Sequence, residues 1–177
     1  MKKTDVKKYL NSLTKEQINN IVLNLYDLSI TNKEFIISKI NPEYENLLLL
    51  DYQNIIENEF VLKNDDFSLD FNNIKKVIKQ YKSISNIPKN VIELILFYVE
   101  CGVNFTQEYG DIGEKFYNNI SNAYHEALNI IFKNNLADEF KFKCLTLQMN
   151  ANGIGYGFSD YMSDLFYGYY VDIDEDS

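Results

Sequence analysis

Hydrophobic residues recur along this chain at the spacing of α-helices rather than of strands. Between residues 14 and 29 they lie three or four positions apart, at Ile18, Ile21, Val22, Leu25 and Leu28. A period near 3.6 residues places such positions on one face of a helix. No stretch of useful length alternates apolar and polar residues as a half-buried strand does. The pattern therefore predicts an all-α protein.

Capping signals divide the pattern into helices. The segments 14–17 (TKEQ) and 31–34 (TNKE) have the form of capping boxes, Asn41 precedes a proline suited to the first helical position, and Asp70 precedes another periodic run. Further helices are expected over about 5–11, 113–134, 136–150 and 158–170. About nine helices with short connections predict one compact domain over 1–170, as an irregular bundle or a short superhelical array of helix hairpins. Residues 171–177 read as an acidic tail.

One helix is expected at the centre of this domain. It opens at residues 86–88 (NIP) and is apolar on nearly every side, with Val91, Ile92, Leu94, Ile95, Leu96, Phe97 and Val99. A helix that is apolar all round is packed by neighbours on more than one face.

Charge and aromatic content are concentrated in the second half of the chain. Residues 1–92 hold 13 Lys against 12 acidic residues, and residues 93–177 hold 4 Lys against 14, so a net charge of +1 precedes one of −10. The second half also holds 17 of the 26 Phe and Tyr. An acidic field repels nucleic acid and anionic membranes and attracts cationic partners. The alternative is a surface that only keeps the protein soluble.

Composition also limits the kinds of binding site that the protein can form and indicates its cellular compartment. All 17 basic residues are lysines, so no guanidinium can clamp a phosphate or carboxylate with two hydrogen bonds. Cys101 and Cys144 are far apart and flanked by apolar residues, which fits a reducing cytosol. The N-terminal segment lacks the apolar region of a signal peptide, and no apolar run approaches the length of a membrane span. We expect a cytoplasmic protein that binds neither nucleic acid nor membrane.

Three stretches of the sequence are similar to a bacterial protein family. They are SLTKEQINNIVLNLYD at 12–27, FYVECGVNFTQEYGDI at 97–112 and GIGYGFSDY at 153–161. Together they resemble the family catalogued as domain of unknown function 6155, over about residues 3–170. The resemblance assigns no catalytic residue. It implies a stand-alone, cytosolic, helical protein.

The glycine-rich segment 153–157 has two interpretations. A phosphate-binding loop would follow a strand and have a lysine nearby, and Asp160 and Asp164 would repel the anion. A tight corner between two helices uses glycine for its positive φ and for close approach of backbones. The corner fits the surrounding sequence better.

The helix after this corner carries more aromatic residues than one buried face can hold. Tyr161 and Phe158 are expected to face the core. The predicted partner-binding surface consists of Tyr156, Asp160, Asp164, Tyr167 and Tyr170. Tyrosines among acidic residues fit a Lys- or Arg-rich partner, through cation–π contacts and charge attraction. The alternative is that this helix is packed on two sides by its own chain.

A second set of candidates concerns catalysis. Glu93, Glu100 and Gln107 recur every seven residues and share one face of the central helix. A desolvated Glu100 would have a raised pKa and would be a candidate acid or base. The alternative is that this face is solvated, or that Glu100 pairs with a lysine or a tyrosine. The full set of pocket candidates is Glu100, Glu108, Tyr109 and His125.

The sequence gives no pattern for a metal or a cofactor. His125 is the single histidine, and it has no partner at the Glu-x-x-His spacing of di-metal bundles. The two cysteines are not paired as zinc ligands are. We expect no metal site and no cofactor.

These features favour a protein-binding module, of adaptor or inhibitor and immunity type, that uses its acidic, tyrosine-rich C-terminal surface. Two alternatives stay open. The protein is a structural homo-oligomer without a ligand, or an enzyme that uses Glu100 as a buried carboxylate.

Overall fold

The computed structural model describes residues 1–61 and 69–174, with side chains up to Val171. These residues form nine α-helices and no strand, which confirms the all-α prediction. The helices are α1 (Lys3–Asn11), α2 (Lys15–Leu28), α3 (Ile30–Ile40), α4 (Tyr44–Glu59), α5 (Phe71–Ile84), α6 (Pro88–Tyr109), α7 (Glu114–Lys133), α8 (Ala137–Asn150) and α9 (Phe158–Asp174). None of the helices in the described ranges is long and apolar enough to cross a membrane.

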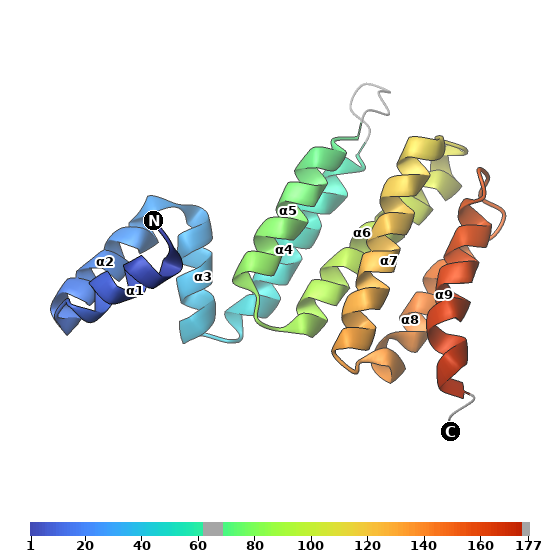
Figure 1. Ribbon diagram of the computed structural model, residues 1–177. Helices are drawn as coiled ribbons and strands as arrows, with labels where there is room; N and C mark the ends of the chain where they lie inside the picture. Colours follow the sequence, from blue (N-terminus) through green and yellow to red (C-terminus); the bar gives the residue numbers. More distant parts are fainter. Residues whose placement is uncertain (62–68, 175–177) are drawn as a thin grey trace.

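From α4 onward the helices form stacked hairpins in two layers (Figure 1). The first layer contains α4, α6 and α8, and the second contains α5, α7 and α9. Each helix of the first layer packs on the helix of the second layer that follows it in the chain, and residues 110–113 and 151–157 connect the second and third of these pairs. Of the two predicted forms, the chain adopts the short array of helix hairpins.

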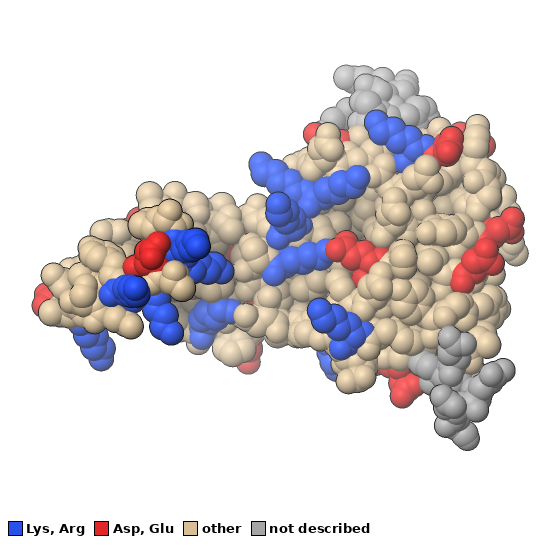
Figure 2. All heavy atoms as spheres, viewed as in Figure 1, with Lys and Arg blue, Asp and Glu red and all other residues tan. Residues whose placement is uncertain are grey.

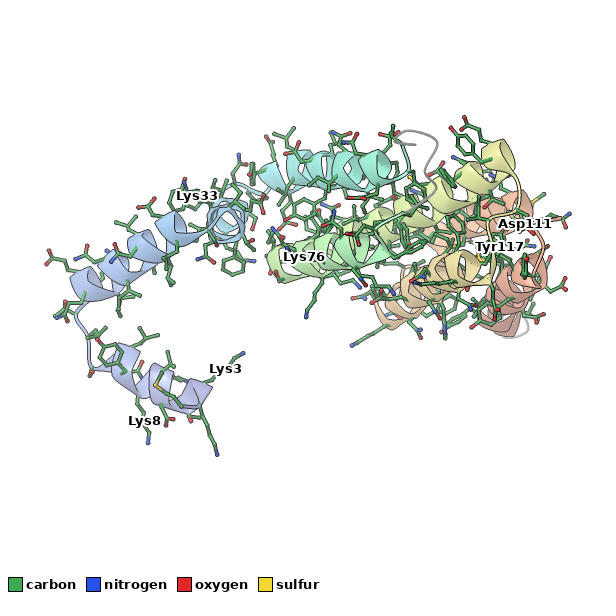
Figure 3. The ribbon with its side chains drawn as sticks, turned by 90° about the horizontal axis from the view of Figure 1, so that it is seen from above. Lys3, Lys8, Lys33, Lys76, Asp111 and Tyr117 are labelled. Atoms are coloured by element: carbon green, nitrogen blue, oxygen red, sulfur yellow. The ribbon has the colours of Figure 1, made fainter. Side chains whose placement is uncertain are left out.

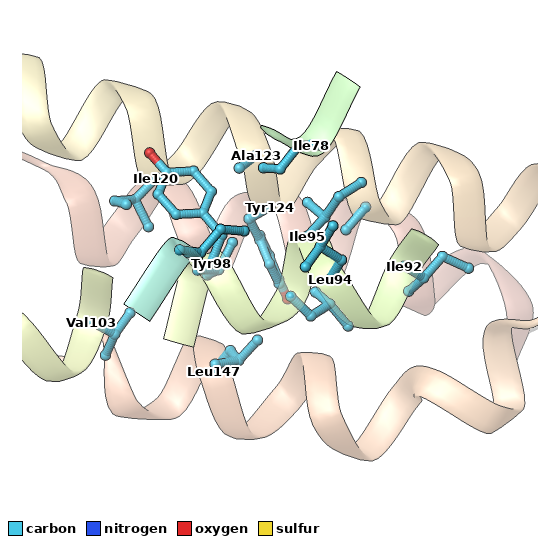
Figure 4. Packing of buried hydrophobic residues seen from close by; sticks show 14 of the residues in the cluster. Ile78, Ile92, Leu94, Ile95, Tyr98, Val103, Ile120, Ala123, Tyr124 and Leu147 are labelled. Carbon is cyan, nitrogen blue, oxygen red and sulfur yellow. The ribbon is translucent and has the colours of Figure 1, made fainter. Parts of the chain in front are cut away.

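The central helix is α6, as its apolar composition predicts. It packs on α4 and α8 within its own layer and on α5 and α7 of the second layer. Its buried side chains include Ile92, Ile95 and Val99, each 0% exposed. Figure 4 shows this core between α6, α7 and α8. Because α6 has neighbours on several sides, it needs apolar residues on more than one face.

Helices α6 and α7 approach each other closely at Gly102. A Cβ atom added to Gly102 would lie 2.4 Å from Cδ1 and 2.7 Å from Cγ1 of Ile120, which is itself fully buried. Glycine in a helix interior costs about 1 kcal/mol relative to alanine. Here the absent side chain makes room for Ile120.

The first two helices lie apart from this core and form an N-terminal arm, residues 3–28 (Figure 3). Neither α1 nor α2 has a buried residue, and the buried hydrophobic cluster of the described residues begins at Leu48. The arm contacts α3, which is held to the body by polar side chains. Tyr52 donates to Glu34 over 2.9 Å, and Gln80 donates to Thr31 over 2.8 Å.

Some predicted helix starts are confirmed and others are wrong. The Thr14 capping box is present, and the Asp70 side chain accepts hydrogen bonds from two backbone N–H groups of α5. The second predicted box is wrong because Ser29, two residues earlier, caps α3 and accepts from the N–H of Asn32 over 3.2 Å. Asn41 accepts from the N–H of Glu43 in a turn, so α4 begins later than expected.

At the C-terminus, α9 runs past the predicted end at residue 170 and continues to Asp174. The expected acidic tail therefore begins inside this helix, and residues 175–177 lie outside the described range. Residues 63–70 are polar and lack helical periodicity, which predicts a loop, and this stretch falls mostly on residues 62–68, which are not described.

The contact at Gly102 gives a first prediction. A Gly102→Val substitution should lower the free energy of unfolding by about 2–3 kcal/mol, because the added methyl groups overpack the core against Ile120. Urea denaturation of the purified protein measures this change. Adding Ile120→Ala to Gly102→Val should recover part of the loss through a coupling of about 1 kcal/mol. Strictly additive effects would show that the two positions do not meet.

Candidate functional site

The glycine-rich segment is a corner between α8 and α9, as predicted. Gly153 and Gly157 have φ of 81° and 68°, which only glycine adopts without strain. Tyr156, between two glycines, also has a positive φ of 54° and is 66% exposed. A bulky residue in this conformation is uncommon, so the corner holds the Tyr156 ring outward at a conformational cost.

The corner rests on the loop between α6 and α7. Tyr117 donates to the carboxylate of Asp111 over 2.5 Å and accepts from the N–H of Ile112 over 3.2 Å. A Cβ atom on Gly155 would lie 3.6 Å from the same carboxylate, so the corner backbone passes directly over Asp111. Figure 3 shows Asp111 and Tyr117 side by side at this end of the array.

This loop starts α7 without a side-chain cap. Asp111 does not cap the helix, because its side chain is engaged by Tyr117 and the N-cap position is occupied by Gly113, with φ of 129°. Burial, followed by the hydrogen bond to Asp111, raises the pKa of Tyr117. The Tyr117 hydroxyl therefore keeps its proton and its bond to the carboxylate at neutral pH.

Helix α9 has one buried and one exposed side. Phe158, Met162, Phe166 and Tyr170 are at most 3% exposed. Asp160, Asp164 and Tyr167 follow one another at the i, i+4 and i+7 positions on the other side and are all exposed. Tyr161 flanks these residues and is 43% exposed. We call Tyr156, Asp160, Tyr161, Asp164 and Tyr167 the tyrosine face.

Two expectations for this helix are therefore wrong. Tyr170 is not on the surface: it is 2% exposed, stacks on Phe166 at a ring-centroid distance of 4.7 Å and donates to the backbone oxygen of Ala137 over 3.3 Å. Tyr161, which was expected in the core, is on the surface instead. The reason is that α9 packs on both α7 and α8, which shifts its buried side toward Tyr170.

A cavity of about 260 Å³ adjoins the tyrosine face. Its wall includes the rings of Tyr117, Tyr156 and Tyr161 and the carboxylate of Glu114. The Tyr117 and Tyr156 ring centroids are 6.0 Å apart. Aromatic faces beside a carboxylate attract ammonium and guanidinium groups. Sequence reasoning missed Glu114 and Tyr117, because only the fold brings the start of α7 against the corner.

The predicted pocket candidates do not come together. Glu100 lines a separate cavity of about 300 Å³ with residues of α8, including Lys143. Its two companions on the same face of α6 also turn to α8: Glu93 forms an ion pair with Lys143, and Gln107 donates to the backbone oxygen of Asn150 over 2.8 Å. The stripe is thus the polar edge of the α6–α8 contact.

The other three candidates lie elsewhere. A ring nitrogen of His125 is 3.1 Å from the hydroxyl of Tyr169, which donates to Asn129 over 2.7 Å. Glu108 and Tyr109 are exposed at the end of α6, where Glu108 raises the pKa of Tyr109. His125 therefore links α7 to α9, and no described cavity joins it to Glu100.

The two cysteines form no disulfide, and their thiols are unreactive. Burial raises the pKa of both Cys101 and Cys144 to about 12, so neither is a thiolate at neutral pH. Within the residues that the structure describes, no three His, Cys, Asp or Glu side chains gather as metal ligands.

Fold and surface together define a small, all-α protein, an array of helix hairpins with an exposed acidic and aromatic face. A family model described as a family of unknown function, DUF6155, matches residues 1–155, and the chain belongs to this family. Comparisons with curated proteins and with solved structures find no significant match. The family match contains Asp111, Tyr117 and Gly155 but ends before α9.

The support beneath the corner gives a second prediction. Tyr117→Phe should lower the free energy of unfolding by about 1–2 kcal/mol, because it removes a hydrogen bond to a carboxylate and one from a backbone N–H. Tyr167→Phe is the matched control and should change stability by less than about 0.5 kcal/mol, since its side chain is exposed. Chemical denaturation of both variants measures the difference. Equal stabilities would mean that the Asp111 contact does not support the corner.

Proposed function

We propose that this protein is a protein-binding module that holds a lysine- or arginine-rich segment of a partner on the tyrosine face. The observation that carries the proposal is the exposed series Asp160, Asp164 and Tyr167 along one side of α9. Figure 2 shows acidic side chains over α9, at the end of the molecule opposite the N-terminal arm. Carboxylates attract a cationic segment over a distance, and tyrosine rings bind it at contact.

The cavity beside this face supplies an anchoring position. It is bounded by three tyrosine rings and by Glu114, and its volume of about 260 Å³ is suited to one long side chain. A lysine or arginine that enters it would place its charge near the Glu114 carboxylate and its methylene groups against the rings. Interfaces draw most of their affinity from a few such anchors in pockets.

The third prediction tests this surface by capture from cell extract. Tyr161→Ala with Tyr167→Ala should reduce the recovery of a bound partner at least tenfold, since each tyrosine at an interface centre is worth about 2 kcal/mol. Quantitative mass spectrometry of the captured proteins measures recovery. Tyr9→Ala is the matched control, because Tyr9 is also exposed, at 60%, but lies on the N-terminal arm.

A second pair of variants tests the charge component. Asp160→Asn with Asp164→Asn should weaken capture of the same partner, and the effect should shrink at high salt, where exposed charges are screened. Thermal unfolding should show that all of these variants are folded. Equal recovery by the wild type, the tyrosine variant and the charge variant would reject the tyrosine face as a binding surface.

Self-association is a second candidate function, and the N-terminal arm favours it. Val22, Leu25 and Leu28 lie on one side of α2 and are 41%, 45% and 72% exposed. Soluble monomers rarely leave a large contiguous apolar patch uncovered. The arm also carries five lysines against three acidic residues over residues 1–28, opposite in sign to the C-terminal half. A second copy of the chain could therefore cover the arm with its acidic surface.

The fourth prediction concerns this arm. Light scattering after size-exclusion chromatography should give a dimer or larger species for the wild type at about 100 μM, a concentration that populates complexes with micromolar Kd. Leu25→Ser with Leu28→Ser should give a monomer, and Leu47→Ser, an exposed leucine on α4, should not change the mass. A monomeric wild type at this concentration would reject the homo-oligomer.

A further inference from the structure

The second layer of helices is open between α5 and α7. Helix α7 packs on α9 in this layer, whereas α5 packs on α3, α4 and α6. The space between α5 and α7 is a groove of about 440 Å³ over α6. Its volume lies in the range of small-molecule sites.

The groove combines an apolar floor with a cationic rim. Ile78, Tyr98 and Ala123 form the floor and are at most 8% exposed. The rim consists of Lys75, Lys79 and Lys82 from α5 and of Asn119, Asn122 and Glu126 from α7. Figure 2 shows lysines gathered over α5, and Figure 4 shows Tyr98, Ile78 and Ala123 near one another in the core.

Two of the three lysines have no counter-ion. Lys82 forms an ion pair with Glu126 across the groove. Lys75 and Lys79 have no ion-pair partner within residues 1–61 and 69–171, although the second half of the chain is strongly acidic. The rim therefore keeps an uncompensated positive charge.

The floor contains a polar atom without a partner. The Tyr98 hydroxyl is buried and has no hydrogen bond to any described residue, and Tyr98 itself is 2% exposed. Buried hydroxyl groups are nearly always hydrogen-bonded, and an unpaired one commonly indicates a group that is supplied by a ligand or a water. The hydrogen-bond donor at the floor and the two unpaired ammonium groups at the rim all favour an anionic ligand.

We infer that this groove binds a small anionic amphiphile, an oxyanion such as a carboxylate, sulfonate or phosphate on a short apolar body. The oxyanion accepts a hydrogen bond from the Tyr98 hydroxyl. It is also attracted by the ammonium groups of Lys75 and Lys79, whose flexible side chains reach over the groove. The apolar body lies along Ile78 and Ala123. This site shares Asn122 with the cavity beside the tyrosine face, but it is opposite to that face in the charge that it attracts.

The fifth prediction uses octanoate as the probe and ¹⁵N-labelled full-length protein as the receptor. Octanoate should shift the amide resonances of residues around the groove with a Kd of about 1 mM or lower, as expected for a ligand of this size. Octan-1-ol, which has the same chain without the charge, should bind at least tenfold more weakly. Equal binding of the alcohol, shifts confined to another region, or no shifts at about 20 mM octanoate would overturn the inference.

Variants assign the contacts. Lys75→Gln with Lys79→Gln should weaken octanoate binding at least tenfold, and Lys76→Gln, on the same helix but outside the groove, should weaken it less than twofold. Tyr98→Phe should weaken binding about threefold or more without lowering the melting temperature of the free protein, because no hydrogen bond within the described chain is lost. A lower melting temperature with unchanged affinity would assign Tyr98 a purely structural role and would overturn its part in binding.

Anionic lipid vesicles distinguish a free amphiphile from a membrane surface. Phosphatidylglycerol vesicles should not capture the protein, whereas octanoate binds it. Capture by vesicles that depends on Lys75 and Lys79, without octanoate binding, would overturn the inference in favour of a membrane contact.

Discussion

The packing of α6 against α7 is the contact on which the rest of the array depends. Each of the two helices belongs to a different layer, so their contact joins the layers at the centre of the molecule. Gly102 brings the backbones together over Ile120, and α4, α5, α8 and α9 then cover the remaining sides of the pair. Interiors are packed at crystal-like density, so a shift of α6 would be transmitted to both candidate sites.

Both sites follow from how the second layer closes around this pair. Where α9 packs on α7, the layer is closed, and the outer side of α9 is free to present the tyrosine face. Where α5 and α7 diverge, the layer is open over Tyr98. The open side has the lysines of α5 at its rim, and the closed side has the carboxylates of α9.

The sequence predicts the features that depend on local physics and misses those that depend on neighbours. Helices and the central position of α6 are predictable, because burial of one face leaves a period of 3.6 residues and burial of nearly all faces leaves an almost continuous apolar run. The cap at Thr31 fails because Ser29, two residues earlier, caps α3 instead, and the two signals look alike in a sequence. Tyr161 is exposed and Tyr170 is buried, the reverse of the prediction. Tyrosine is found both on surfaces and in cores, and here the positions of α7 and α8 determine which of the two is buried. The groove over Tyr98 has no local signal, since lysines on the outer side of α5 are expected in any solvated helix.

The α8–α9 corner connects the part of the chain that matches the family model to the surface that carries the proposed function. Tyr156 is held at a positive φ, a conformation that a bulky side chain adopts only when its surroundings impose it. Next to Tyr156, Gly155 passes over Asp111, which Tyr117 holds in place. Asp111, Tyr117 and Gly155 all lie within the family match, whereas α9 lies beyond it. Residues within the family match therefore form the support beneath the corner. The corner leads into Tyr156 and the first turn of α9, which line the cavity. Under the proposed function, a change in the charges or tyrosines of α9 would alter the partner that is bound while leaving that support intact.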